Sequence, residues 1–404
     1  MSLRIARVLH AGYVFELAGT RVLFDPLFET PFSRNCHAFP DVRFDALLIS
    51  HYHDDHLSLE SLDLIARTTP IYLYSVHEEF FALLREMGFR EVHALDLNIP
   101  VKVGEIEAIP GPALDADTDS IFEVHADGRR ILNVVDSWIT DSTLARLPGP
   151  WDLVLWPFQT LREIEALCPA LREPATGEVP SEWPAQWRVL NPRALVPSSC
   201  QFRFPPGSWL NHEYFPITYA GFARQVRAVL PEVQIVRMEP GEVWEWDAGQ
   251  MRRCGRLPWV ELLSSELVEY VYDPEGIPTS IGEIARSLGA LDPSTRTLIR
   301  QWVRAQNFAP NFSWRLMIYD ETGTAEVFNF PEGVEPEVLT EIPALKLWAA
   351  LKTGESLTSI HARVTPRELR EDFDPLEDPL LQALYRGDVG SYQRGQLRRL
   401  RGED

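Results

Sequence analysis

The feature that most constrains this chain is an apolar strand that ends in a dense group of histidines and aspartates. Phe44–Ser50 contains the run Leu47-Leu48-Ile49, which predicts a buried β-strand. Directly after it, residues 51–56 are His-Tyr-His-Asp-Asp-His. Burying so many ionisable groups together costs much free energy unless a cation lies among them, and imidazole and carboxylate ligands suit zinc, iron and manganese. The segment therefore predicts a metal site at the end of a buried strand.

The first third of the chain alternates β-rich runs with helical patterns, which is typical of an α/β fold with helices covering the sheets. Arg4–Leu17 and Thr20–Phe24 predict an opening pair of strands, and Ser58 suits the N-cap of a helix that runs to about Ala66. A hairpin is predicted around Asp127-Gly128, because glycine tolerates the positive φ of a tight turn. Further strands are predicted at Ile71–Val76, Val101–Ile109, Ile121–His125, Arg130–Val135, Trp151–Phe158, Arg193–Pro197 and Gln234–Met238, and further helices at Glu78–Met87 and near Ile217–Leu230.

Two regions interrupt this pattern. Cys168–Pro192 contains five prolines, which predicts a long surface loop or a lid. After Glu239-Pro240-Gly241 the character changes, with a capping box at Ser280-Ile-Gly-Glu283 and a second hairpin around Thr322-Gly323. We expect a boundary near 245–260, which gives a domain at 1–245 and a smaller α+β domain at 260–404.

The charge of the chain limits its partners. The 404 residues include 38 Lys and Arg against 59 Asp and Glu, a net charge of −21. Such an acidic field repels nucleic acids and anionic membranes, and favours a small or neutral substrate. The four cysteines show no C-x-x-C spacing, and there is neither a long apolar signal segment nor an apolar run long enough to span a bilayer. We therefore expect a cytoplasmic protein with a small-molecule substrate, and no oligomeric state is predicted.

The histidine-rich segment resembles the H-x-H-x-D-H signature of the metallo-β-lactamase superfamily. The residues that match this signature are His51, His53, Asp55 and His56. Upstream, His10-Ala11-Gly12 and Asp25-Pro26 look like the opening of a family member, and downstream Asp136 resembles the aspartate that bridges two metals in the family. Over about residues 4–240 the resemblance implies an αββα sandwich, and it looks like the broad hydrolase branch with lactonase- and phospholipase-like members. It implies that His51 and His53 hold one metal, that Asp55 and His56 hold a second, and that Asp136 reaches both.

The chain departs from the family pattern at two ligands. The third histidine is missing from residues 111–117, where Asp115 is the nearest match and Asp117 its neighbour. A carboxylate there favours iron or manganese over zinc, and the alternative is a lost site. The distal histidine is replaced by Ser199, with His212 and Cys200 as the candidate substitutes.

One residue has an expected supporting role. The resemblance places Asp25 behind the metal loop, where its carboxylate would fix a histidine tautomer. Asp25 is otherwise a turn aspartate before a proline.

The leading expectation is a hydrolase that uses a metal-activated water on an ester, lactone, amide or phosphodiester. Asp55 and Asp136 are the predicted catalytic carboxylates, with Asp136 orienting the nucleophile. One or two divalent ions are expected, with zinc first and iron or manganese as alternatives. The first alternative function is an iron-dependent oxidoreductase on the same fold. The second is a degenerate, non-catalytic protein that binds a metal or ligand, with aromatic surface at Trp302, Phe308, Trp314, Phe328 and Trp348.

Overall fold

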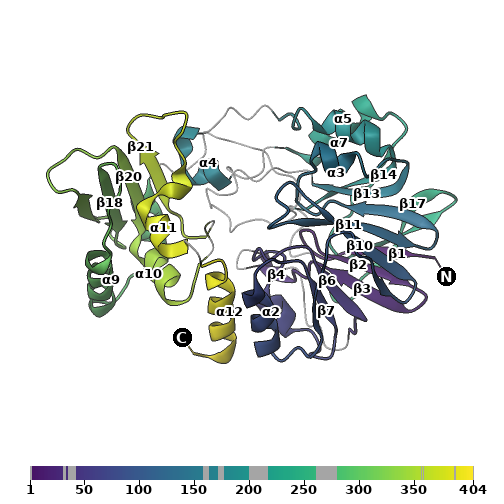
Figure 1. The fold of residues 1–404 in the computed structure, drawn as a ribbon, viewed down its shortest axis with the longest axis horizontal. Helices are drawn as coiled ribbons and strands as arrows, with labels where there is room; N and C mark the ends of the chain where they lie inside the picture. The colour runs from purple at the N-terminus through teal and green to yellow at the C-terminus, as the bar shows by residue number, and fades with distance from the viewer. Residues whose placement is uncertain are drawn as a thin grey trace. The chain divides into compact units, whose positions relative to one another are not determined.

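The computed structural model describes residues 2–30, 33–34, 42–157, 163–171, 177–199, 217–260, 280–355, 357, 359–385 and 388–403. These residues form two compact units (Figure 1). The first unit contains the described residues up to 157, together with 177–199 and 217–260. The second unit contains those from 280 onward, and the segment 163–171 belongs to it as well.

The first unit is a sandwich of two mixed sheets. One sheet has eight strands in the order β17-β16-β1-β2-β3-β6-β7-β8. These strands are β1 Arg4–Arg7, β2 Tyr13–Leu17, β3 Thr20–Phe24, β6 Ala46–Ile49, β7 Ile71–Leu73, β8 Val92–Ala94, β16 Glu242–Asp247 and β17 Gln250–Arg256. A short separate hairpin is made by β4 Glu29–Thr30 and β5 Ser33–Arg34. From β3 to β8 the pairing is parallel, and the rest of the eight-stranded sheet is antiparallel.

The other sheet has seven strands in the order β15-β14-β13-β12-β11-β10-β9. They are β9 Val101–Val103, β10 Ile106–Pro112, β11 Ser120–Ala126, β12 Arg129–Asn133, β13 Trp151–Pro157, β14 Pro192–Ser198 and β15 Gln234–Ile235. Strands β9 to β12 pair antiparallel, whereas β12 to β15 pair parallel. Each sheet thus carries a parallel half, and in such sheets ligands bind beyond the carboxyl ends of the strands.

Two apolar layers hold the sandwich together. Between the sheets, alternate residues of facing strands form one core, which includes Phe15, Phe24 and Phe122. Behind the second sheet, Trp183, Trp187 and other side chains pack under helices. The helices of this unit are α1 Leu59–Asp63, α2 Glu78–Glu86, α3 Asp141–Leu144, α5 Trp183–Leu190 and α7 Tyr219–Val229. The predicted αββα sandwich is confirmed.

Local sequence signals explain where several elements begin. Ser58 caps α1, because its side chain accepts a hydrogen bond from Ser61 N. Asp127 and Gly128 both have positive φ, 52° and 67°, as the tight turn between β11 and β12 requires. Thr218 caps α7 in the same way as Ser58 caps α1.

Three sequence predictions about local structure are wrong. Arg4–Leu17 is not one strand, since β1 and β2 pair antiparallel and are joined by a turn that contains His10, with φ of 53°. Val101–Ile109 is not one strand, since β9 and β10 form a hairpin that turns at Gly104 with φ of 58°. Nor is Cys168–Pro192 an irregular loop throughout, because residues 183–190 form α5. Trp183, Trp187 and Leu190 repeat with helical spacing and are buried, a signal that the prolines obscured.

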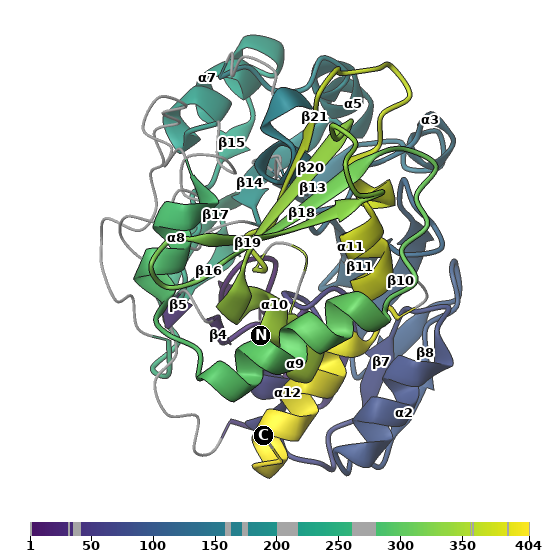
Figure 2. The same cartoon turned by 90° about the vertical axis from the view of Figure 1, so that its left-hand side faces the viewer.

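The second unit is built on a four-stranded sheet in the order β19-β18-β20-β21 (Figure 2). Its strands are β18 Trp314–Tyr319, β19 Ala325–Phe330, β20 Val338–Pro343 and β21 Arg363–Pro366. Its helices are α4 Glu163–Leu167, η1 Pro169–Leu171, α8 Ile281–Leu288, α9 Pro293–Ala305, α10 Ala344–Lys352, η4 Pro375–Glu377, α11 Pro379–Tyr385 and α12 Ser391–Arg401. The second hairpin and the Ser280 cap are confirmed. Among the described residues, no helix combines the length and the apolar character needed to cross a bilayer.

The aromatic residues singled out in the second unit belong to its core. Trp314 is 1% exposed, and Trp302, Phe308, Phe328 and Trp348 pack against the same apolar cluster. Trp314 is therefore a core residue, and the other four are partly buried around the core.

Candidate metal centre

The donor side chains lie in loops at one edge of the sandwich. Asp25 follows β3, His51 follows β6 and Asp136 follows β12. Strands β3 and β6 are parallel neighbours, so their carboxyl ends meet. Asp119 immediately precedes β11, which is antiparallel to β12, and its loop therefore reaches the same edge.

The loop after β6 folds into a tight turn. His56 N and Leu57 N both donate to His53 O, at 3.0 and 2.7 Å. This turn brings the His56 ring back over the His51 ring, with centroids 3.9 Å apart. His51 Nδ1 lies 2.9 Å from Ser50 Oγ, which leaves its Nε2 facing the centre.

A first donor group consists of His51, His53 and Asp119, whose ligand atoms lie within 4.8 Å of one another. His51 Nε2 is 3.9 Å from Asp119 Oδ1. Ser120 Oγ donates to Ser50 O at 2.7 Å, and this bond ties the start of β11 to the end of β6. Asp119 Oδ1 is buried and has no hydrogen-bond partner among the described residues. A buried oxygen left in this way is an acceptor that a cation would satisfy.

A second donor group consists of His10, Asp55, His56 and Asp136, again with ligand atoms within 4.8 Å of one another. His10 Nε2 is 3.0 Å from His56 Nε2 and 3.1 Å from Asp55 Oδ2. His56 Nε2 lies 3.1 Å from Asp136 Oδ2. Both imidazole rings are buried.

Asp136 faces both donor groups. Its Oδ2 contacts His56 as above, while its Oδ1 is 4.0 Å from His51 Nε2. The preceding Val135 has a φ of 65°, an unusual conformation for a β-branched residue, and its N–H is held by Asn133 Oδ1 at 3.1 Å. Strained backbone of this kind costs about 1–3 kcal/mol and clusters at functional sites.

Asp25 lies behind the second donor group. It is fully buried, and its Oδ1 accepts from Ser50 N at 2.7 Å. Its Oδ2 is 3.7 Å from His56 Nδ1, the ring nitrogen that points away from the donor centre. A carboxylate at this nitrogen orients the ring and favours the tautomer whose Nε2 is free to bind a metal.

The ionisable groups of the site shift one another's pKa values. Burial lowers the pKa of His56, but the carboxylates of Asp136 and Asp55 outweigh it and hold that pKa well above the ordinary value. Burial likewise raises the pKa of Asp136, yet His56 and His10 outweigh it and hold it well below the ordinary value. Burial and the nearby Asp136 raise the pKa of Asp119 to about 6. Without a metal, protons must therefore supply the positive charge that these carboxylates require.

The donor chemistry fits a metal. Imidazole and carboxylate ligands are those of zinc, iron and manganese sites, and the two groups share one carboxylate that faces both. Asp119 Oδ1, which is buried and accepts no hydrogen bond from the described residues, also suits a cation.

Comparisons with known proteins agree with this geometry. The profile of the Metallo-beta-lactamase superfamily matches residues 7–141. The predicted resemblance to this superfamily is therefore confirmed over these residues. A UPF0173 metal-dependent hydrolase from Caldivirga maquilingensis is 26% identical over 243 residues, which are 58% of this chain and 94% of the relative.

Solved structures give fold-level likenesses. The metallo hydrolase Igni18 from Ignicoccus hospitalis is 18% identical, with a TM-score of 0.43, over 61% of this chain and 99% of that protein. The diiron beta-hydroxylase CmlA from Streptomyces venezuelae is also 18% identical, with a TM-score of 0.41, over 63% of this chain and 54% of that protein.

Within the first unit, the predicted residues divide into three sets. The residues that the structure brings together are His51, His53, Asp55, His56 and Asp136, with Asp25 behind them. Asp115 lies outside both donor groups, because its carboxylate accepts from Asp117 N and Thr118 Oγ1 and so caps its own turn. His212 and Cys200 lie outside the described residues.

Two members of the donor groups were missed. Asp119 was not predicted because the strand before it was expected to end at Ile109. In the structure β10 continues to Pro112, which places the ligand further along the chain. Its signal was its position directly before a strand. His10 was predicted only as part of an N-terminal stretch that resembles the family, and not as a ligand. A histidine and a glycine in the turn between two buried strands were the signal for its position.

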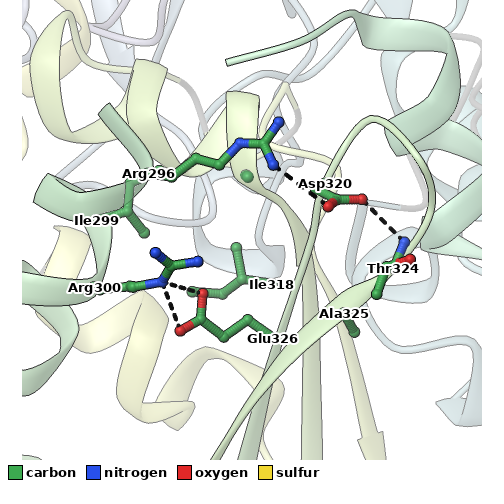
Figure 3. Close-up of a pocket in the computed structure, with 9 residues that line it drawn as sticks. Arg296, Ile299, Arg300, Ile318, Asp320, Thr324, Ala325 and Glu326 are labelled. Atoms are coloured by element: carbon green, nitrogen blue, oxygen red, sulfur yellow. Dashed lines mark hydrogen bonds and ion pairs between the residues drawn. The ribbon is translucent and has the colours of Figure 1, made fainter. Parts of the chain in front are cut away.

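The second unit has a surface hollow of about 200 Å³ between α9 and the β18–β19 hairpin (Figure 3). Arg296 pairs there with Asp320 and Arg300 with Glu326. Since each guanidinium already meets a carboxylate, the hollow has no free charge of the kind that marks an anion site.

Proposed function

We propose that the first unit is a metal-dependent hydrolase that acts on an ester, lactone, amide or phosphodiester of a small molecule. The observation that carries the proposal is the pair of donor groups joined by Asp136 at one edge of the sandwich. The superfamily match and similarity to a metal-dependent hydrolase support it.

The proposed roles follow from position. His51 and His53 would hold one ion, and Asp55 and His56 a second, with Asp136 shared. A divalent ion there supplies a Lewis acid and lowers the pKa of a coordinated water to about 7. Asp136 orients the attacking water, because its two oxygens face the two groups. Asp25 keeps the His56 ring in place from behind.

The double variant His53→Ala/Asp55→Ala tests the proposal, since it removes one donor from each group. We expect loss of tightly bound metal and a fall in hydrolysis of roughly 1,000-fold or more against a panel of esters, lactones and phosphodiesters. The matched control is His93→Ala, an exposed histidine that stacks on Tyr72 outside the site. Elemental analysis that finds full metal content in the double variant would end the proposal.

An iron-dependent oxidoreductase is the second candidate, and Asp119 favours it. A carboxylate in the first donor group, where the family pattern has an imidazole, makes that group harder and better suited to iron or manganese than to zinc. Protein produced with trace metals alone decides between the two, because zinc without iron removes this candidate.

Asp119 also gives a sharper test of metal choice. The variant Asp119→His restores the family's imidazole, and we expect it to raise the zinc-to-iron ratio at equal supply by roughly 10-fold. An unchanged ratio would show that Asp119 does not set the metal.

A non-catalytic binding protein remains the outcome if dialysed wild-type protein holds no metal and stays folded. The net charge of −21 supports a small or neutral substrate rather than nucleic acid or a membrane. A cytoplasmic location stays a prediction from the cysteine pattern.

A further inference from the structure

We infer that His10 is a metal ligand that supplies, from the first hairpin of the chain, the distal imidazole that the family pattern places at Ser199. The inference rests on the proposed function, because it assigns a ligand of the same centre. It concerns the fourth member of the second donor group, a residue that the sequence signature does not contain.

The first argument is where the backbone of His10 lies. Arg7 is fully buried, and its guanidinium donates to His10 O at 2.8 Å and to Ser199 O at 3.0 Å. The same group donates to Pro197 O at 3.1 Å and to Met238 O at 3.3 Å. One side chain thus fastens the turn that bears His10 to the end of β14, next to the position of the missing imidazole.

The second argument is the conformation of the turn. His10 has a φ of 53°, in the left-handed region that non-glycine residues seldom adopt. The turn is closed by Val8 N donating to Gly12 O and Gly12 N donating to Leu9 O, both at 2.8 Å. A Cβ at Gly12 would come within 2.9 Å of Asp25 O and Leu9 O, so only glycine fits there. The chain accepts strain to hold this histidine in one orientation.

The third argument is the spacing of the donor atoms. Ligands about 2.0–2.1 Å from a tetrahedral ion lie about 3.3 Å from one another, by the geometry of a tetrahedron. His10 Nε2 lies 3.0 Å from His56 Nε2, 3.1 Å from Asp55 Oδ2 and 3.6 Å from Asp136 Oδ2. Of the remaining pairs, His56 Nε2 is 3.1 Å from Asp136 Oδ2 and 3.6 Å from Asp55 Oδ1. Five of the six pairs thus lie 3.0–3.6 Å apart, with Asp55 facing His10 through Oδ2 and His56 through Oδ1.

The fourth argument is that hydrogen bonds alone cannot give His10 Nε2 a suitable partner in each of the groups that it faces. A neutral imidazole Nε2 either donates one proton or accepts one, yet His10 Nε2 faces another ring nitrogen and two carboxylates at once. One cation at the centre satisfies all four groups together. At the replaced position, Ser199 Oγ is buried and has no hydrogen-bond partner among the described residues.

The test measures metal binding in His10→Asn, since asparagine tolerates a left-handed backbone better than most residues and carries no imidazole. The full-length chain is loaded with Co²⁺, and affinity is measured by competition with a chelator. Histidine ligands are counted by their paramagnetically shifted ring N–H protons. The comparison variants are His212→Ala, Cys200→Ala and the surface control His93→Asn, and circular dichroism checks the fold of each.

We expect His10→Asn to lose one shifted ring proton and to weaken binding of one Co²⁺ by roughly 100-fold or more, beyond the loss that an outer hydrogen-bond partner causes. His212→Ala, Cys200→Ala and His93→Asn should bind as the wild type does. Retention of every shifted proton in His10→Asn overturns the inference, even with a modest loss of affinity, and so does a larger loss in His212→Ala or Cys200→Ala. In those cases the wild type still binds metal and the proposed function stands, whereas a wild type that binds no Co²⁺ defeats both.

Discussion

The two units bury charged side chains in opposite ways. In the second unit, Asp378 is 2% exposed and accepts hydrogen bonds from Leu380 N and Leu381 N, at 2.9 and 3.3 Å, and from the hydroxyl of Thr340. Its neighbours are donors that the chain itself provides. In the first unit, the buried rings of His10 and His56 instead face the partly buried carboxylates of Asp55 and Asp136.

The difference shows which kind of buried charge points to a ligand. A buried carboxylate surrounded by N–H and O–H donors is a structural residue, because its hydrogen-bonding capacity is met. Where imidazole nitrogens and carboxylate oxygens converge, a proton or a metal ion must supply the positive charge between them. By this criterion we expect the first unit to bind a cation, whereas Asp378 in the second unit needs none.

Removal of metal should give the largest contrast between the units. At ion concentrations about 1,000 times Kd, binding contributes about 4 kcal/mol to the free energy of unfolding, so a chelator should lower the Tm of the first unit by roughly 10 °C. Hydrogen exchange should quicken in β6 and in the loop after β12, while β18 and β20 of the second unit keep their protection. Equal effects in both units, or none, would break the comparison.

The pH dependence of the second unit should come from buried Asp378 and partly buried His361, whose pKa values are shifted in opposite directions. Burial raises the pKa of Asp378 to about 6, so its contribution to stability is complete below pH 3.8 and is lost as pH rises through about 6. Burial and the nearby Lys346 lower the pKa of His361 to about 4, so its contribution is complete above pH 6.5 and is lost as pH falls through about 4. Between pH 4 and 6 a rise in pH therefore lowers the contribution of Asp378 to stability and raises that of His361.

Single substitutions should reveal how each of the two residues changes the free energy of unfolding with pH. In Asp378→Asn the free energy of unfolding should fall by about 2–3 kcal/mol as pH decreases from 6.5 to 4, because the histidine acts alone. In His361→Asn it should rise by a similar amount over the same range. Hydrogen exchange of β20, corrected for the intrinsic pH dependence, measures both. Parallel pH profiles in the two variants would refute the assignment.

The smallest effects concern helix caps. Ser58→Ala and Asp292→Ala each remove a side-chain acceptor at a helix start and should each cost about 1 kcal/mol. Only Ser58 lies beside the metal loop, so we expect only its variant to weaken metal binding, by a few-fold. Chelator competition on both variants tests this, and an equal effect from Asp292→Ala would contradict a local cause.

The sequence predicted the parts of the site that follow from local pattern. The loop 51–56 and Asp136 were found because a buried strand and a tight hairpin are short-range signals. Asp119 and His10 were not, since their positions depend on contacts far along the chain. Ser120 reaches Ser50, and Arg7 reaches Ser199, a link between residues 192 positions apart. No window of sequence contains such pairs.

The fold was predictable for a related reason. Alternation of strand and helix patterns identified the sandwich, and failures occurred where one signal hid another. Prolines masked the Trp183 and Trp187 repeat of α5, and a glycine turn divided the expected strand at Val101–Ile109. In both segments a proline or glycine, which usually ends an element, lies within a periodic pattern of apolar residues.

The short helices α4 and η1 have a consequence for biosynthesis. They leave the ribosome in the middle of the first unit, yet they pack on β21, which begins at Arg363, 192 residues after Leu171. During translation this stretch therefore lacks its final partner until β21 has also left the ribosome. Splitting the gene between the units would separate it from the half in which it belongs.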